Sequence, residues 1–196
     1  MQLEDLTDVA SDIVVEAIKK AKSAEQGPSP EHLLLSMLEH SDSIIPTIFV
    51  RYNLDQSQLV EDLSLYLSMM PQVKDPPEDQ GNVVNVSPRL IAQLERAKKS
   101  AKDNGDDYVD TLTLFKQFYT EGTENKAHNL LTMHGMSLER VVTSFSHLRG
   151  KKKVKTRKER ASDKILSKYC TDMVKAAAAR EYSPVIGREF ETRRLI

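Results

Sequence analysis

The sequence predicts an all-α fold made of two copies of a four-helix unit, and the first observation behind this is a stretch that occurs twice. It is Ser29 to Leu38 in the first copy and Asp110 to Tyr119 in the second. Ser and Asp side chains cap the free N–H groups at the start of a helix, so each stretch begins as a helix does. Behind both caps, apolar residues stand at i, i+1, i+4 and i+5, which gives a helix face wide enough to pack against several neighbours.

The second observation is that the flanking segments repeat as well. A helix start at Thr7 recurs 80 residues later at Ser87, and a helix end at Asn53 recurs 82 residues later at Gly135. The offset between matching positions grows from 80 to 82 residues, so the second copy has slightly longer loops. Extra residues in loops change the stability of a fold little. We therefore expect a tandem repeat with two small cores, joined in one compact, pseudo-twofold domain over residues 1–149.

The first copy reads as helices separated by short stops. Gly27 and Pro28 end the first helix, and Pro46 suits the first turn of the third. Asp55 caps the fourth, which carries leucines to position 67. The helices are expected at 7–25, 29–38, 44–52 and 55–67.

The second copy follows a linker at 71–86, whose three prolines and one glycine exclude a continuous helix. Ser87 and Pro88 then supply a cap and a first helical residue, and Ser137 caps the last helix. The helices are expected from 87, at 110–119, at 123–133 and from 137 to a stop near Gly150.

Composition describes an ordinary globular chain of 196 residues, 39% apolar and 29% charged, with a net charge of −1. Its one cysteine, Cys170, excludes an internal disulfide framework and suits a reducing compartment. The start has no apolar core of a signal peptide, and no apolar run approaches the roughly 20 residues that span a bilayer. We expect a cytoplasmic protein without a membrane partner. The five histidines share no ligand spacing, so no metal site is predicted.

Residues 151–160 hold seven basic side chains and one acid. Such a block repels itself, which predicts a flexible, solvated linker over 150–161. The alternative is a site for a polyanion such as nucleic acid, although no aromatic residue is interleaved for base stacking. A further helix is expected at about 162–180.

The chain resembles the N-terminal part of the Clp-family AAA+ unfoldases and disaggregases, most of all the ClpB type, with ClpA, ClpC and ClpV types as runners-up. The residues that carry the resemblance include the double repeat, the basic segment, Met70-Pro-Gln-Val73, Leu148-Arg-Gly150 and Leu166 to Met173. The most specific match is Pro184-Val-Ile-Gly-Arg188, which is similar to the entry into the first AAA+ module of these proteins. The resemblance covers the whole chain.

The resemblance implies a substrate- or adaptor-recruiting domain at 1–149 and the start of an AAA+ module at 162–196. It implies unfolded or aggregated proteins, or a dedicated adaptor, as partners, and a homohexameric full-length protein that uses ATP and Mg. Positions matching Val185 and Ile186 touch adenine in the family. No Gly-rich phosphate loop ending in Gly-Lys-Ser or Gly-Lys-Thr occurs, so the chain is not expected to hydrolyse ATP and needs no cofactor.

The resemblance also implies a partner-binding surface. The candidate residues are Thr7, Arg96, Ser100, Asp106 and Thr113. ClpB-type domains bind unfolded segments in an apolar groove, whereas the matching Arg96, Ser100 and Thr113 are polar, so polar or acidic segments or a dedicated adaptor would suit this chain. The alternative function is a freestanding helical interaction module whose basic segment binds a polyanion.

Overall fold

A computed structural model of the chain describes residues 3–72, 86–120, 125–150, 152–158 and 173. Most of the expected linker at 71–86, nearly all of the expected helix at 162–180, and both Val185 and Ile186 lie outside these residues. The described residues form eight α-helices and two short 3-10 helices, with no β-sheet. The predicted all-α class is confirmed.

The first copy contains a 3-10 helix η1 (Leu3–Asp5) and four α-helices. Their bounds lie within a few residues of the prediction, which is the usual uncertainty of helix ends. They are α1 (Asp8–Ser23), α2 (Pro30–Glu39), α3 (Ile45–Arg51) and α4 (Gln56–Ser68).

The second copy repeats the order of the four α-helices and shows two differences from the prediction. Its central helix α6 is shorter than expected, because the last turn tightens into the 3-10 helix η2, as helix ends commonly do. The following helix begins after an Asn125 cap rather than near Thr123, which lies outside the described residues. The elements are α5 (Pro88–Asp103), α6 (Thr111–Lys116), η2 (Gln117–Tyr119), α7 (Lys126–Met133) and α8 (Leu138–Arg149).

Most of the predicted caps form. In each case a side-chain oxygen accepts a hydrogen bond from a backbone N–H in the first turn, and the capping residues are Thr7, Asp55, Ser87, Asp110 and Ser137. Ser29 is the exception. Its hydroxyl lies 2.9 Å from Nδ1 of His32 and caps nothing, so the start of α2 depends on Pro30 and on tertiary packing.

The helix ends show the repeat in the backbone itself. Two residues beyond the ends of α1 and α5, the backbone takes a positive φ, at Glu25 (55°) and Gly105 (74°). The same holds after α3 and α7, at Asn53 (51°) and Gly135 (80°). After each, a backbone N–H returns to the carbonyl five residues earlier, as in Gln26 to Ala21, which is the Schellman arrangement. The same turn therefore closes the matching helices of the two copies.

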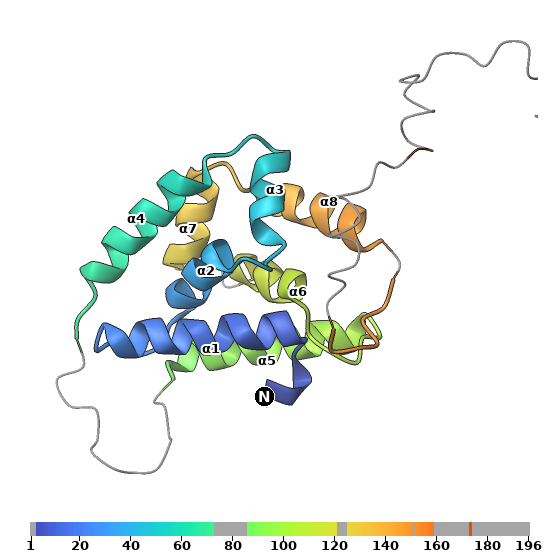
Figure 1. Cartoon of the computed structure of the whole chain (residues 1–196), viewed down its shortest axis with the longest axis horizontal. Coiled ribbons are helices and arrows are strands. Elements are labelled where there is room, and N and C mark those ends of the chain that lie inside the picture. The colour runs from blue at the N-terminus through green and yellow to red at the C-terminus, as the bar shows by residue number, and fades with distance from the viewer. Residues whose placement is uncertain (1–2, 73–85, 121–124, 151, 159–172, 174–196) are drawn as a thin grey trace, which may run out of the picture. The chain divides into compact units, whose positions relative to one another are not determined.

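Helices α2 and α6 lie between α1 and α5 on one side and α3, α4, α7 and α8 on the other (Figure 1). Every residue from Pro30 to Leu38 is buried, and so is every residue from Thr111 to Phe115. The buried apolar side chains of both copies form one continuous cluster, so the prediction of two small cores is wrong. The copies merge because α2 packs against α5 and α7, and α6 packs against α1 and α3.

A short extended contact also links the copies. Leu6 and Val109 form an isolated parallel bridge, in which the Thr7 N–H donates to the Val109 carbonyl over 3.0 Å. The Val109 N–H donates in turn to the Asp5 carbonyl over 2.9 Å. This contact places the start of α1 beside the loop that joins α5 to α6, where Asp106 lies.

Candidate partner-binding surface

The five predicted site residues fall into two groups. Thr7, Asp106 and Thr113 are buried, with 0%, 7% and 1% of their surface exposed, whereas Arg96 and Ser100 are half-buried on α5. A partner can contact only accessible side chains, and the three buried residues are not accessible in this structure. Arg96 and Ser100 remain as the accessible part of the predicted surface.

Thr7 has a structural role in the fold. Its hydroxyl accepts a hydrogen bond from the Ala10 N–H over 3.4 Å and its backbone N–H takes part in the bridge to Val109. A buried N-cap of this kind stabilises a helix by about 1 kcal/mol. A partner could reach this side chain only if the start of α1 moved.

Asp106 and Thr113 are brought together by Arg149, a residue that the sequence analysis did not select. The Arg149 guanidinium forms an ion pair with Asp106, lies 3.6 Å from Oδ2 of Asp110, and donates to the Thr113 hydroxyl over 3.4 Å. It also stacks over the Phe145 ring, 5.0 Å from the centroid. A basic side chain in the last turn of a helix interacts favourably with the helix dipole, which explains its position in α8. Nothing else in the sequence indicates its long-range partners.

The Arg149–Asp106 pair is almost fully removed from water, since the two side chains are 8% and 0% exposed. Removing one partner from such a pair typically costs several kcal/mol, because the other charge stays buried and unpaired. The pair therefore holds α8 against the loop after α5. It fixes the position of that loop and of the surface that the loop presents.

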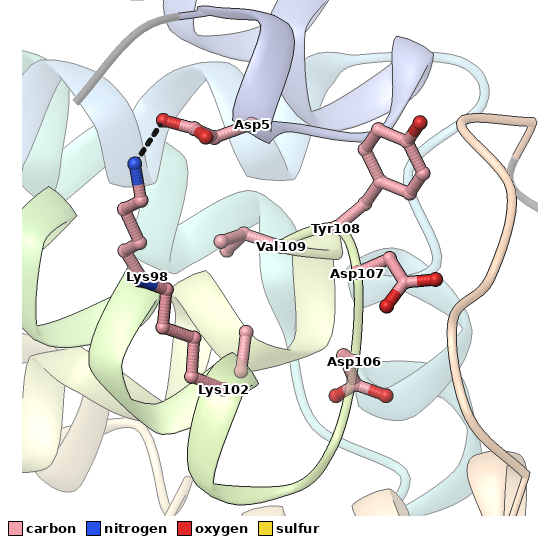
Figure 2. A pocket seen from close by; sticks show the side chains of 8 residues that line it. Asp5, Lys98, Lys102, Asp106, Asp107, Tyr108 and Val109 are labelled. Atoms are coloured by element: carbon pink, nitrogen blue, oxygen red, sulfur yellow. Dashed lines mark hydrogen bonds and ion pairs between the residues drawn. The ribbon is translucent and has the colours of Figure 1, made fainter.

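Beside this loop lies a shallow cleft of about 350 Å³. Lys98 and Lys102 project from α5 on one side, the loop from Asp106 to Val109 forms the other, and Asp5 pairs with Lys98 at 2.6 Å (Figure 2). Acids and bases are mixed along its walls, so the cleft suits a polar or charged segment. Of the five predicted site residues, only Asp106 lines it.

Residues 152–158, here called the strap, lie along the same loop. The Val154 N–H donates to Oδ1 of Asp106 and the Val154 carbonyl accepts from the Asp107 N–H, both over 2.9 Å. Lys155 pairs with Asp107 at 2.8 Å and Arg157 with Asp8 at 3.4 Å. This part of the basic segment is exposed, apart from half-buried Val154, and is also held by backbone hydrogen bonds and ion pairs that the sequence did not predict. The flexibility of the linker over 150–161 stays a prediction.

The described contacts of His32 are hydrogen bonds within the fold. Nδ1 of His32 faces the Ser29 hydroxyl and Nε2 faces Oε1 of Gln26, whose amide nitrogen donates to the Leu67 and Met70 carbonyls. Burial lowers the pKa of His32, although nearby Glu31 partly opposes this. No group of three or more His, Cys, Asp or Glu side chains suited to a metal ion occurs in the described part of the chain. No described helix is long and apolar enough to cross a membrane.

Comparison with known proteins agrees with this architecture. The chain is 28% identical over 184 residues to the chaperone ClpB of Bdellovibrio bacteriovorus and 31% identical over 196 residues to that of Rhodopirellula baltica. These matches cover 93% and 100% of the chain but only 21% and 22% of the two relatives. The chain therefore spans about a fifth of the length of these proteins.

Two solved structures share the fold. The N-terminal domain of Hsp104 from Candida albicans superposes with a TM-score of 0.66 at 21% identity, covering 78% of this chain and 97% of that one. The N-terminal domain of ClpV1 from enteroaggregative E. coli gives 0.62 at 17% identity, covering 81% and 93%. Both likenesses show that the all-helical fold is shared.

Residues 5–134 match the family model of the Clp repeat N-terminal domain. Together with the double-repeat fold, this match shows that the chain belongs to the Clp N-terminal domain family. The resemblance inferred from the sequence is confirmed.

Proposed function

We propose that the chain recruits protein substrates or an adaptor to an ATP-driven unfoldase or disaggregase ring. The observation that carries this proposal is the family match over 5–134, joined by ClpB relatives that match along the whole chain. In this proposal the chain itself catalyses nothing. Hydrolysis of ATP with Mg, adenine contact through Val185 and Ile186, a homohexameric ring and a cytoplasmic location belong to a longer protein.

The described surface supports a recruiting role for a polar partner. The accessible predicted residues, Arg96 and Ser100, lie on α5, the helix that also supplies Lys98 and Lys102 to the cleft. Arg96 and Ser100 are four residues apart and share one face of α5, whereas Lys98 and Lys102 share another face, so the support comes from Arg96 and Ser100 alone. Their polar side chains favour an acidic or polar segment over the apolar segments that the ClpB-type groove takes. A dedicated adaptor is one source of such a segment.

Substitution of Arg96 by Leu tests this surface. The change should strengthen binding of a permanently unfolded apolar protein by up to roughly thirtyfold, because a buried Leu side chain contributes about 2 kcal/mol. It should weaken binding of an acidic peptide by removing a charge. Fluorescence anisotropy with both labelled ligands measures the two effects.

The matched control is Arg51→Leu, the same change at an exposed position at the end of α3. It should leave both affinities as they are in the unsubstituted chain. If Arg96→Leu and Arg51→Leu behave alike towards both ligands, partner binding does not occur at α5. If the unsubstituted chain binds neither ligand, the recruiting function itself is contradicted.

The alternative, a freestanding module that binds a polyanion through its basic segment, gains no support from the described contacts. Lys155 and Arg157 are already paired with acidic side chains. A polyanion would have to separate both pairs before it could use these charges. Binding of a labelled oligonucleotide at physiological salt would favour this alternative.

A further inference from the structure

The strap meets the domain at three acidic residues, Asp8, Asp106 and Asp107, here called the acidic edge. The edge combines the start of α1 with the loop after α5, which the Leu6–Val109 bridge holds together. Asp106 is buried and oriented by Arg149, whereas the side chains of Asp8 and Asp107 are 52% and 54% exposed. The edge thus contains one buried acceptor and two exposed carboxylates.

The contacts between the strap and the edge are of two kinds. Main-chain groups of the strap are bound at two points: Val154 exchanges two hydrogen bonds with Asp106 and Asp107, and the Arg157 carbonyl accepts from the Asp8 N–H over 2.8 Å. Side chains add the two ion pairs, Lys155 to Asp107 and Arg157 to Asp8. The main-chain contacts do not depend on which side chains the segment carries, whereas the ion pairs select basic side chains.

The hydrogen bond to Asp8 has a particular physical reason. Asp8 is the first residue of α1, and the first N–H groups of a helix have no partner inside that helix. Thr7 satisfies the N–H of Ala10, and the strap supplies the acceptor for Asp8. The strap therefore completes the cap of α1 from a part of the chain that is distant in sequence.

We propose that the acidic edge is a docking site for basic segments and that the strap occupies it within the same molecule. A basic segment of another protein can dock only when the strap leaves. The inference does not rest on the recruiting function proposed above, because the occupant of the site belongs to this chain. It adds a class of partner, basic segments, which the sequence analysis did not predict.

Binding of a labelled peptide with the strap sequence, residues 152–158, to the 196-residue chain tests the proposal. In the unsubstituted chain the strap competes at the high effective concentration of a tethered segment, so the peptide should bind weakly. The variant Lys155→Glu with Arg157→Glu releases the strap and leaves the edge intact. It should bind the peptide roughly tenfold more tightly, since each exposed ion pair changes an equilibrium by roughly two- to fivefold.

The matched control is Lys153→Glu with Lys158→Glu, which changes the net charge equally at strap residues that no described ion pair joins to the edge. This control should bind the peptide as the unsubstituted chain does. Adding Asp8→Asn and Asp107→Asn to the releasing variant should remove the gain. All these side chains are at least 44% exposed or lie on the exposed strap, so the melting temperature should stay within a few degrees.

Hydrogen exchange gives an independent readout of occupancy. The Val154 amide should exchange slowly in the unsubstituted chain and quickly in the releasing variant, and salt at about 1 M should reduce the difference by screening the ion pairs. The proposal is overturned if the releasing variant binds the peptide no better than the control. It is overturned equally if Asp8→Asn with Asp107→Asn leaves peptide binding unchanged.

Discussion

At the scale of single residues, local capping was predictable and long-range pairing was not. The caps at Thr7, Asp55 and Asp110 involve a side chain and an N–H two or three residues away, so the sequence contains both partners side by side. Arg149 donates a hydrogen bond to Thr113, 36 residues away in the sequence, and no local pattern predicts such a contact. The sequence therefore identified Asp106 and Thr113 as site candidates without showing that both are buried around one guanidinium.

His32 carries the prediction for pH dependence. Burial lowers its pKa below the ordinary value of 6.5, so the folded state prefers the neutral ring. As pH falls below about 6.5 the unfolded chain takes up the proton first, and stability falls until pH reaches the lower pKa of the folded state. Stability from this source is fully present above pH 6.5.

Urea unfolding of the unsubstituted chain and of His32→Gln at pH 7.5 and pH 5 measures this effect. The loss of unfolding free energy between the two pH values should be smaller in His32→Gln, because the titrating group is gone. His134, which lies 2.8 Å from Asp62, is present in both proteins, so any contribution from it cancels in the comparison. Equal losses in the two proteins would show that His32 does not contribute.

At the scale of elements, periodicity predicted nearly every described helix, and the deviations have physical causes. The apolar faces of α1, α2 and α5 depend on residues within a few turns, so their positions follow from the sequence. The tightening of α6 into η2 and the position of the strap depend on tertiary contacts. Seven basic residues among the ten positions 151–160 predict a solvated segment. Only the folded domain shows that acidic side chains lie close enough to pair with two of them.

The matching helix ends of α1 and α5 yield a stability prediction. Glu25 has a φ of 55°, and its counterpart Gly105 has a φ of 74°. Glycine adopts a positive φ without strain, whereas glutamate does not. A side chain in this region costs about 1 kcal/mol or more, partly offset because Gly makes the unfolded chain more flexible. Glu25→Gly should therefore raise the free energy of unfolding by about 0.5 to 1 kcal/mol relative to Glu25→Ala.

The comparison with Glu25→Ala matters because both variants remove the exposed carboxylate, whereas only Glu25→Gly removes the backbone strain of a positive φ. Gly105→Ala should have the opposite effect and lower the free energy of unfolding by about 1 kcal/mol. The new Cβ there would lie 2.9 Å from Nζ of Lys153, which can move aside because it ends a flexible side chain. A Glu25→Gly variant no more stable than Glu25→Ala would contradict the repeat-based explanation.

At the scale of the whole molecule, the sequence predicted the tandem repeat and the family, while the junction between the copies required the structure. Each copy has an apolar face that cannot remain in water, which predicts burial but does not say against what. In the structure, the central helices α2 and α6 each pack against helices of the other copy, so the two expected cores form one.

The central claim is that this domain brings protein partners to an ATP-driven ring. The most direct measurement replaces the N-terminal domain of a ClpB relative by residues 1–158 of this chain and follows reactivation of an aggregated enzyme. The account predicts faster reactivation than by the same ring without any N-terminal domain, with equal ATP hydrolysis by the two rings. Equal reactivation by the two rings, for acidic, basic and apolar aggregated substrates alike, would contradict it.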